Sequence, residues 1–190
     1  MATHYDWHEL NDEILSCRLC QLCETRTHVV LGEGNPSAKV MLVGEGPGKD
    51  EDATGRPFVG RAGQLLDKML AAVDLDRDKV YITNVVKCRP PNNRTPSDDE
   101  AQACLPYLRA QFALVRPAII VCLGATAAKY IYAPDIRITR DRGKWKQSKG
   151  VWILPTYHPA ALLRNEGWKR ESWEDMKSIR EKVAELELGT

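Results

Sequence analysis

Four cysteines of this sequence are spaced so that their thiolates can bind a metal. Cys17 and Cys20 form a C-x2-C pair, and Cys88 and Cys104 bracket a proline-rich stretch. Four thiolates in two pairs can hold a tetrahedral zinc ion or an iron–sulfur cluster. The alternative is that all four are buried, reduced cysteines without a ligand. Cys23 follows Cys20 closely and can replace it as a ligand, but we expect its side chain to point elsewhere.

A second group of chemically versatile side chains stands where short apolar runs end. Glu45, Asn84 and His158 each lie at or just after the end of such a run. Glu45 belongs to a glycine-rich loop, residues 44–48, whose glycines leave backbone amides bare. An anion or an acceptor-rich ring can bind to amides of this kind. A tight turn without a ligand is the competing interpretation.

The glycine-rich loop matches neither of the common phosphate-binding motifs. No Gly-Lys-Ser or Gly-Lys-Thr follows it at the spacing of a Walker loop. Gly44, Gly46 and Gly48 are spaced as GxGxG, which differs from the dinucleotide fingerprint. The rest of the chain must therefore indicate what the loop binds.

The apolar runs are predicted to be buried strands that alternate with helices. Four alternations predict a parallel sheet covered on both faces, which is a three-layer α/β/α sandwich with a mostly parallel, four-stranded central sheet. Such strands end along one edge, where open α/β folds bind their ligands. Glu45, Asn84 and His158 are therefore expected in one site. The predicted strands are 40–43, 80–85, 118–123 and 151–156.

Apolar residues at helical spacing and capping residues predict the helices. Ser97, with Glu100 three residues later, forms a capping box at the start of one of them. Prolines exclude regular structure from the stretch 87–96. Cys122 lies inside an apolar run and is expected in the core. The predicted helices are about 6–17, 61–73, 97–114, 125–132 and 168–186.

Length and composition indicate one globular domain over residues 1–190. The chain is 43% hydrophobic, contains no apolar run long enough to cross a membrane, and begins without signal-peptide character. We therefore expect a soluble, intracellular, cytoplasmic protein. We also expect it to act as a monomer. In that compartment, six cysteines favour metal binding or burial over disulfides. The net charge of +1 means that any phosphate-binding face must be local.

Five blocks of the chain, in order, closely resemble the family 4 uracil-DNA glycosylases, the iron–sulfur branch of the uracil-DNA glycosylase superfamily. The blocks are CRLCQLCETRT, GEGPGKDED, GRPFVGRAGQLLDKML, YITNVVKCRPPNNRTP and YHPAALLRN. The resemblance covers nearly the whole chain. It implies an enzyme of base excision repair that flips uracil out of DNA and hydrolyses its bond to deoxyribose, leaving an abasic site. No lysine is an obvious Schiff-base nucleophile, so strand cleavage is not expected.

The resemblance implies a 4Fe–4S cluster held by four of the cysteines. In that family the cluster has a structural role and anchors a loop that faces DNA. The corresponding cysteines here are Cys17, Cys20, Cys88 and Cys104.

The resemblance also implies a pocket for uracil. Phe58 offers an aromatic face to the flipped ring, and base stacking contributes ~1–3 kcal/mol. The amide of Asn84 matches uracil O4 and N3–H, whereas cytosine presents the inverse pattern. His158 and amides near Glu45 and Gly46 stabilise the negative charge that gathers on uracil O2. From the residues alone, Phe58 can be a core residue, Asn84 can equally be a turn cap, and His158 can lie at the surface or behind the site without touching a ligand. The pocket residues are Glu45, Gly46, Pro47, Phe58, Asn84 and His158.

The chain departs from the best-known branch of the superfamily at two positions. Gly46 stands where that branch has a water-orienting aspartate, and Gly48 stands where it has an aromatic gate against thymine. Glu45 is the first candidate for contacting the water or the ring, and Glu51 the second. We expect a dissociative mechanism in which the sugar cation forms first and water adds late.

The resemblance implies that uracil-containing DNA, single- or double-stranded, is the partner and uracil the product. When bound to DNA the protein is then associated with the nucleoid. Relatives insert an apolar side chain into the gap left by the flipped base, and Leu162 or Leu163 is the candidate here. Four basic residues near the same edge are expected to grip phosphates, namely Lys87, Arg89, Arg94 and Arg164.

Two other functions compete with hydrolysis. A relative that captures uracil-DNA and stays attached is the first, but that branch carries an inserted Lys-Arg-Arg-Ile-His stretch where this chain has Lys87-Cys88-Arg89-Pro90-Pro91. An iron–sulfur electron carrier is the second. A cluster that exchanges electrons at low potential in a protein without glycosylase activity would favour it.

Overall fold

The structure, a computed structural model, describes residues 6–188. Four parallel strands form the centre of its sheet, in the spatial order β3-β2-β4-β6. Their apolar runs are buried almost throughout, which confirms the predicted parallel core. The bounds are Val40–Gly44 for β2, Val80–Asn84 for β3, Ile119–Leu123 for β4 and Val151–Thr156 for β6.

Two short strands at the edges enlarge the sheet beyond the predicted four strands. β1 (Glu33–Gly34) pairs antiparallel with β3, and β5 (Lys146–Ser148) pairs antiparallel with β6. Within residues 6–188 the sheet therefore has six strands. The added strands are short and mostly exposed, so they lack the apolar pattern that predicts a buried strand.

Side chains of each central strand alternate between two separate apolar cores. Val40 and Leu42 of β2 belong to the core on one face, and Met41 and Val43 to the core on the other. The first core includes residues of α4 and α9, and the second includes residues of α1, α5 and α6. This arrangement confirms the three-layer α/β/α sandwich. The bounds are Trp7–Leu15 for α1, Arg61–Ala71 for α4, Asp98–Val115 for α5, Ala125–Ile131 for α6 and Lys169–Leu188 for α9.

Short helices occupy several connections that were predicted as loops. The prolines are expected to exclude regular structure from the stretch 87–96, but it contains one short 3-10 helix, interrupted by the left-handed backbone angles of Asn92. The capping box of Ser97 and Glu100 is confirmed at the start of α5. The short elements are α2 (Leu22–Thr25), α3 (Lys49–Thr54), η1 (Pro91–Asn93), α7 (Ile138–Asp141), α8 (Pro159–Arg164) and η2 (Glu166–Trp168).

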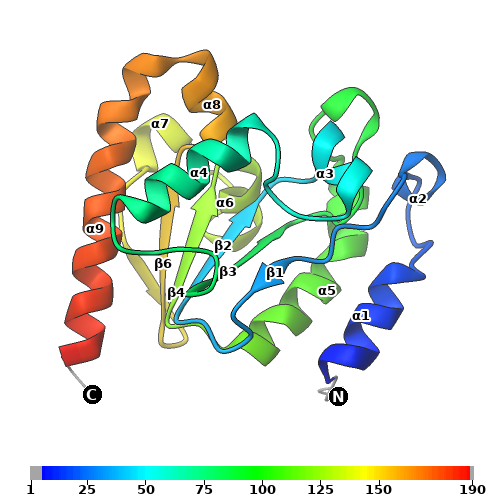
Figure 1. Cartoon of the computed structure of the whole chain (residues 1–190), viewed down its shortest axis with the longest axis horizontal. Coiled ribbons are helices and arrows are strands. Elements are labelled where there is room, and N and C mark those ends of the chain that lie inside the picture. The colour runs from blue at the N-terminus through cyan, green and yellow to red at the C-terminus, as the bar shows by residue number, and fades with distance from the viewer. Residues whose placement is uncertain (1–5, 189–190) are drawn as a thin grey trace.

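The edge of the sheet at which the parallel strands end is flanked by α3 and α8. Both helices lie at the top of Figure 1, whereas the two chain ends lie at the bottom. Each short helix directly follows a strand end, so it carries its side chains over that edge. Among residues 6–188, no helix has the length and apolar character needed to cross a membrane.

Candidate active site

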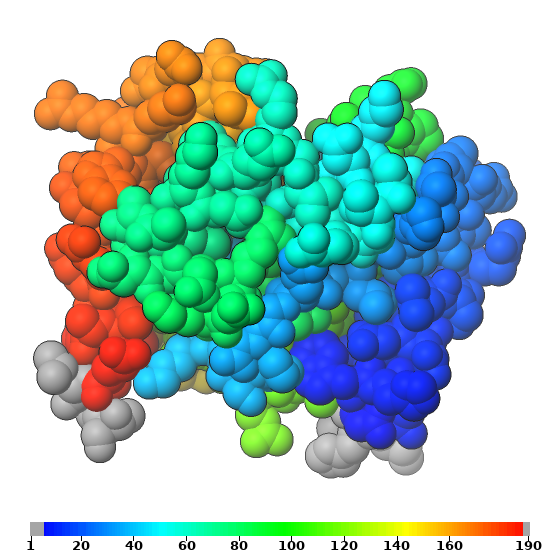
Figure 2. Space-filling model, viewed as in Figure 1, coloured from blue at the N-terminus to red at the C-terminus, as the bar shows by residue number. Residues whose placement is uncertain are grey.

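A cleft of about 610 Å³ opens at the carboxyl edge of the sheet. Glu45, Gly46 and Pro47 of the glycine-rich loop line it, together with His158 at the end of β6. The cleft continues between α3, the loop 90–95 and α8. Figure 2 shows the upper rim of the molecule hollowed between its turquoise and green segments. Two of the three predicted strand ends therefore face one cavity.

The third strand end, Asn84, lies beneath the floor of this cleft with Phe58. A Cβ atom added to Gly44 would lie 2.5 Å from Asn84 Oδ1 and 2.6 Å from Phe58 Cζ, so both side chains contact the same glycine. The rings of Phe58 and His158 stack with centroids 5.5 Å apart. The structure thus brings Glu45, Phe58, Asn84 and His158 together, as the parallel topology predicts.

Asn84 carries an unpaired polar atom in a buried position. The residue is 2% exposed, and its Oδ1 has no hydrogen-bond partner within the structure. Buried side-chain oxygens are nearly always hydrogen-bonded in native proteins. Asn84 occupies the last position of β3, opposite Gly44, at the edge of the sheet where the cleft opens.

Phe58 is held in a constrained backbone conformation next to Asn84. Its φ of 53° is unusual for a residue other than glycine. Arg77 stabilises this turn by donating to the carbonyl oxygens of both Pro57 and Phe58. The phenyl ring is 4% exposed and packs in one of the two cores, so it serves as core whatever else it contacts.

The hydrogen bonds of His158 determine which ring nitrogen carries the proton. His158 caps α8, and the backbone N–H of Ala160 donates to Nδ1 over 3.0 Å. Nδ1 must therefore be unprotonated, which leaves the proton of the neutral ring on Nε2. Burial, aided by the positive charge of Arg164, lowers the pKa of His158 to about 4. The ring is a neutral N–H donor at physiological pH.

Thr126 is a residue of the site that the sequence did not single out. Its Oγ1 donates to Glu45 Oε2 over 2.5 Å and fixes this carboxylate at the cleft. Thr126 lies on α6, which starts just after β4, so the strand-end rule that found Glu45 also applies to it. The stacked rings of Tyr157 and Trp168, 4.5 Å apart, form another wall of the cleft that sequence reasoning missed.

The acidic run on α3 divides between the cleft and the interior. Glu51 lines the cleft, and burial, with the nearby Asp50 carboxylate, raises its pKa. Asp52 is 5% exposed and accepts hydrogen bonds from the backbone N–H groups of Thr27 and His28. This buried carboxylate anchors α3 to the segment that follows the first three cysteines.

The predicted phosphate-binding residues are not equivalent. Lys87 is 1% exposed, so the prediction that it grips phosphate is wrong. Arg94 lines the cleft but is paired with Glu100 over 2.6 Å, and Arg89 donates to Asn93. Arg164 is exposed at the cleft.

The two candidate leucines of α8 differ in burial. Leu162 is 1% exposed and packs against α4 and α9, which removes it as a residue that could insert into DNA. Leu163 is only partly buried and stays a candidate.

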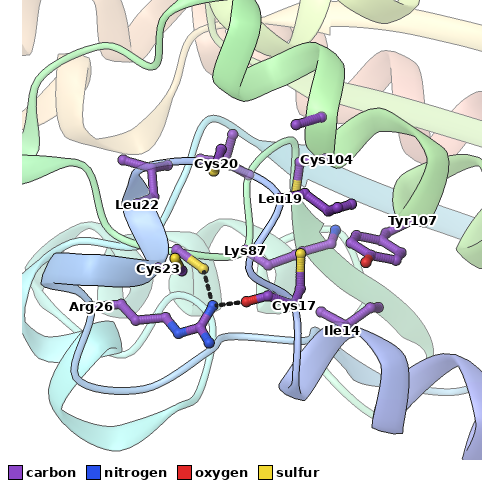
Figure 3. Close-up of a pocket in the computed structure, with 13 residues that line it drawn as sticks. Ile14, Cys17, Leu19, Cys20, Leu22, Cys23, Arg26, Lys87, Cys104 and Tyr107 are labelled. Atoms are coloured by element: carbon purple, nitrogen blue, oxygen red, sulfur yellow. Dashed lines mark hydrogen bonds between the residues drawn. The ribbon is translucent and has the colours of Figure 1, made fainter.

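Five of the six cysteines surround a separate, mainly apolar cavity, shown in Figure 3. All six are free thiols, and Cys122 lies in the core as predicted. Among residues 6–188, no three Cys, His, Asp or Glu side chains are grouped as ligands of a single metal ion. The five thiols thus face one cavity without converging on one point. The lining cysteines are Cys17, Cys20, Cys23, Cys88 and Cys104.

Cationic side chains border the cysteine cavity. Arg26 donates to Cys88 Sγ over 3.3 Å and to the Cys17 carbonyl over 2.8 Å, so it joins two of the cysteine segments. Lys87 lines the cavity from the β3 side. Burial lowers the pKa of Lys87 to about 8 and raises that of the Cys104 thiol to about 11.

Comparisons with known proteins agree with this architecture. Residues 31–177 match the family model described as the uracil DNA glycosylase superfamily. The chain is 50% identical over 182 residues to the type-4 uracil-DNA glycosylase of Sulfurisphaera tokodaii, covering 91% of this chain and 83% of that protein. It is 47% identical to the Archaeoglobus fulgidus type-4 enzyme, covering 89% of each, and 49% identical to that of Thermotoga maritima, covering 82% of each. The chain therefore belongs to the uracil-DNA glycosylase superfamily, within its type-4 branch.

Proposed function

We propose that this protein is a DNA-repair enzyme that hydrolyses the bond between uracil and deoxyribose in DNA and leaves an abasic site. Family membership supports the reaction. The single structural observation that carries the proposal is the unpaired, buried amide oxygen of Asn84, placed against Phe58 and beside His158. A pyrimidine with a polar edge supplies the hydrogen-bond donor that the Asn84 amide oxygen lacks.

Recognition of uracil follows from the hydrogen-bonding pattern of Asn84. The amide oxygen accepts from uracil N3–H and the amide nitrogen donates to O4. Cytosine would leave both groups unpaired, at a cost of roughly 1–3 kcal/mol for each buried group. Phe58 and Asn84 lie beneath the cleft rather than along it, so we propose that the glycine-rich loop shifts when a flipped base enters.

Departure of uracil depends on His158. As the bond breaks, negative charge gathers on uracil O2, and Nε2–H of the neutral imidazole donates to it. The backbone amides of Glu45, Gly46 and the following loop add further donors at the same edge. Losing one such donor typically costs ~2.7–4 kcal/mol of transition-state stabilisation.

Addition of water is assigned to Glu45, with Glu51 as the second candidate. Thr126 holds Glu45 at the cleft, so its carboxylate is already oriented before DNA binds. Neither carboxylate needs to act before the sugar cation has formed, since the mechanism is dissociative. Water then adds to the cation and completes hydrolysis.

A 4Fe–4S cluster fits the chemistry of the cysteine cavity. Each iron of such a cluster takes its own thiolate, so the ligands surround a volume rather than a point. We propose Cys17, Cys20, Cys88 and Cys104 as ligands and a structural role in fixing the loops beside the cleft. Cys17→Ser is then expected to lower the iron content of the purified protein, and Cys23→Ser to leave it unchanged. Equal iron loss in both variants would refute this ligand set.

We propose that the chain acts as one domain, residues 1–190, and as a cytoplasmic monomer that associates with the nucleoid through DNA. Single- and double-stranded DNA that contains uracil are both proposed substrates. Leu163 is proposed to enter the gap left by the flipped base. Arg164 and Lys49 are both exposed cations of the cleft, and Arg164 is proposed to contact a phosphate.

A direct assay tests this function. The purified protein is incubated with a uracil-containing oligonucleotide, and alkali then reveals abasic sites. We expect wild type to produce them, and His158→Ala and Asn84→Ala to lose most activity while they retain wild-type iron. His8→Ala changes an exposed histidine of α1 and should stay fully active. Full activity of both pocket variants would show the pocket to be wrong, and stable uracil-DNA binding without abasic sites would show a binding protein.

A further inference from the structure

Lys87 is a fully buried cation between the cysteine cavity and Asn84. Its Nζ donates to Thr83 Oγ1 over 2.8 Å, to the Asn84 carbonyl over 2.6 Å and to Gln111 Oε1 over 2.7 Å. These bonds use all three N–H groups of the ammonium. All three acceptors are uncharged, so the hydrogen bonds are satisfied but the charge is not balanced.

The charge of Lys87 points to an anion in the cysteine cavity. Among residues 6–188, no carboxylate oxygen lies within 4.0 Å of Lys87 Nζ. Burying an unpaired charge is costly, and buried charges in proteins are as a rule paired with an opposite charge or placed at a metal centre. Lys87 lines the same cavity as Cys88 and Cys104. Thiolates that hold a metal centre there would supply the missing negative charge.

On its other side, Lys87 fixes the peptide that carries the base-reading amide. Its shortest hydrogen bond is to the carbonyl of Asn84, the last residue of β3. Gln111 extends the network, because its Nε2 donates to the Leu31 carbonyl over 2.7 Å. β3, α5 and the segment before β1 are thereby joined through one ammonium group.

We propose that Lys87 is a positioning residue that couples the two sites, balancing thiolate charge in the cysteine cavity while holding Asn84 in place to read uracil. The first half of the proposal rests on the proposed cluster, and the second half rests on the proposed glycosylase function. Loss of the ammonium then has two consequences: the metal centre is held less firmly, and uracil binds less tightly. Nothing in this role requires Lys87 to touch DNA.

The test compares Lys87→Met, which keeps most of the volume but removes the charge, with Lys87→Arg, which keeps the charge. Two quantities are measured on iron-loaded protein: the rate of iron release to a chelator, and the inhibition constant of free uracil relative to the affinity for DNA without uracil. We expect Lys87→Met to release iron at least about fivefold faster and to raise the uracil inhibition constant about tenfold at unchanged DNA affinity. We expect Lys87→Arg to show values of the iron-release rate and of the uracil inhibition constant that lie between those of Lys87→Met and wild type.

A second variant keeps the proposal falsifiable if Lys87→Met does not fold. Gln111→Glu puts a carboxylate against the ammonium and is expected to speed iron release in the same direction. Lys146→Met, at an exposed lysine that donates to the Tyr132 carbonyl, is the matched control and should change neither quantity.

The possible results distinguish the role of Lys87 from the proposed function. Wild-type iron release and uracil inhibition in both Lys87→Met and Gln111→Glu would overturn the role of Lys87. Faster iron release with unchanged uracil inhibition would overturn the coupling. If wild-type protein excises no uracil, the proposed function fails, whereas the iron-release comparison still decides the charge-balancing half.

Discussion

The proton on His158 is the smallest feature on which the proposed chemistry depends. A pKa of about 4 keeps the ring neutral at every pH well above 4, so its donor state is constant from pH 5.5 to 8. We therefore expect the single-turnover rate of uracil release to show no inflection near 6.5, the usual pKa of histidine. Near pH 4, protonated Nδ1 can no longer accept from Ala160, and the rate should change there.

The pH profile of His158→Ala completes this prediction. Its rate should be roughly 100- to 1,000-fold lower than that of wild type, because one charge-stabilising donor is gone. The deficit should be the same at pH 5.5 and pH 8. An acid limb near pH 6.5 in wild type that disappears in His158→Ala would mean that the imidazole is ordinarily titratable and that the neutral-donor assignment fails.

Thr126 offers a second test at the level of single residues. Thr126→Val keeps the shape of the side chain but removes the donor to Glu45, so the carboxylate is no longer held. A hydrogen bond to a charged group contributes ~1.5–3 kcal/mol, and we expect the single-turnover rate to fall about tenfold or more. Thr126→Ser keeps the hydroxyl and should stay close to wild type. Equal rates in the Val and Ser variants would argue against orientation of Glu45 by this bond.

The end of β2 shows how an element constrains the site. Gly44 is packed so closely that a Cβ would clash with both Asn84 and Phe58, whereas a Cβ on Gly48 would meet only ordinary contacts at 3.6 Å. Overpacking of this kind costs ~1–3 kcal/mol. We expect Gly44→Ala to lower uracil excision at least about tenfold and Gly48→Ala to be nearly silent, in the oligonucleotide assay. Similar activity of the two variants would contradict the packing around Asn84.

The elements that could be predicted are those whose pattern is local. The central strands are continuous apolar runs, and the capping box of Ser97 marks the start of α5. β1 and β5 could not be predicted, since pairing with longer strands, rather than their own composition, holds them. α3 and α8 are too short to be stable alone and depend on contacts such as that of Asp52 with Thr27.

The candidate site was predictable to the extent that topology determines it. Parallel strands end at one edge, so Glu45, Asn84 and His158 had to come near one another. Lys87 was misread, because a lysine close to arginines suggests solvent and phosphate. Its burial depends on acceptors from α5 and β3 that meet only in the folded protein. The depth of Asn84 beneath the cleft floor was likewise a property of packing.

At the scale of the whole molecule, α9 holds the end of β6 that carries His158. Asp175 of α9 is 2% exposed. Its carboxylate accepts two hydrogen bonds from Arg142 and one from Thr156.

Asp175→Ala removes the short ion pair of the Arg142 guanidinium, which keeps only its longer ion pair with Glu171 at 3.7 Å. It also leaves the Thr156 hydroxyl without its acceptor. Removing one partner of a buried pair costs up to ~3–5 kcal/mol. We expect urea unfolding to show a loss of stability of this order. Glu174→Ala, at the exposed neighbouring position, should change the unfolding free energy by less than ~0.5 kcal/mol.

The charge of the whole molecule makes DNA binding depend on a local patch. With a net charge of +1, the protein has no global field to attract DNA, so the few exposed cations at the cleft must supply the electrostatic attraction. Each phosphate contact contributes about −0.9 to the slope of log affinity against log salt for duplex DNA.

Arg164→Ala should therefore make that slope shallower by about one unit, with weaker binding to DNA of any sequence. Fluorescence anisotropy with a labelled duplex at several salt concentrations measures it. Arg180→Ala is the matched control, because Arg180 is also exposed but borders a groove at the start of β2, at the opposite edge of the sheet. The slope of log affinity against log salt for Arg180→Ala should equal that of wild type. If the two variants change the slope equally, DNA is attracted by the overall charge of the protein, and the cleft is not the surface that binds it.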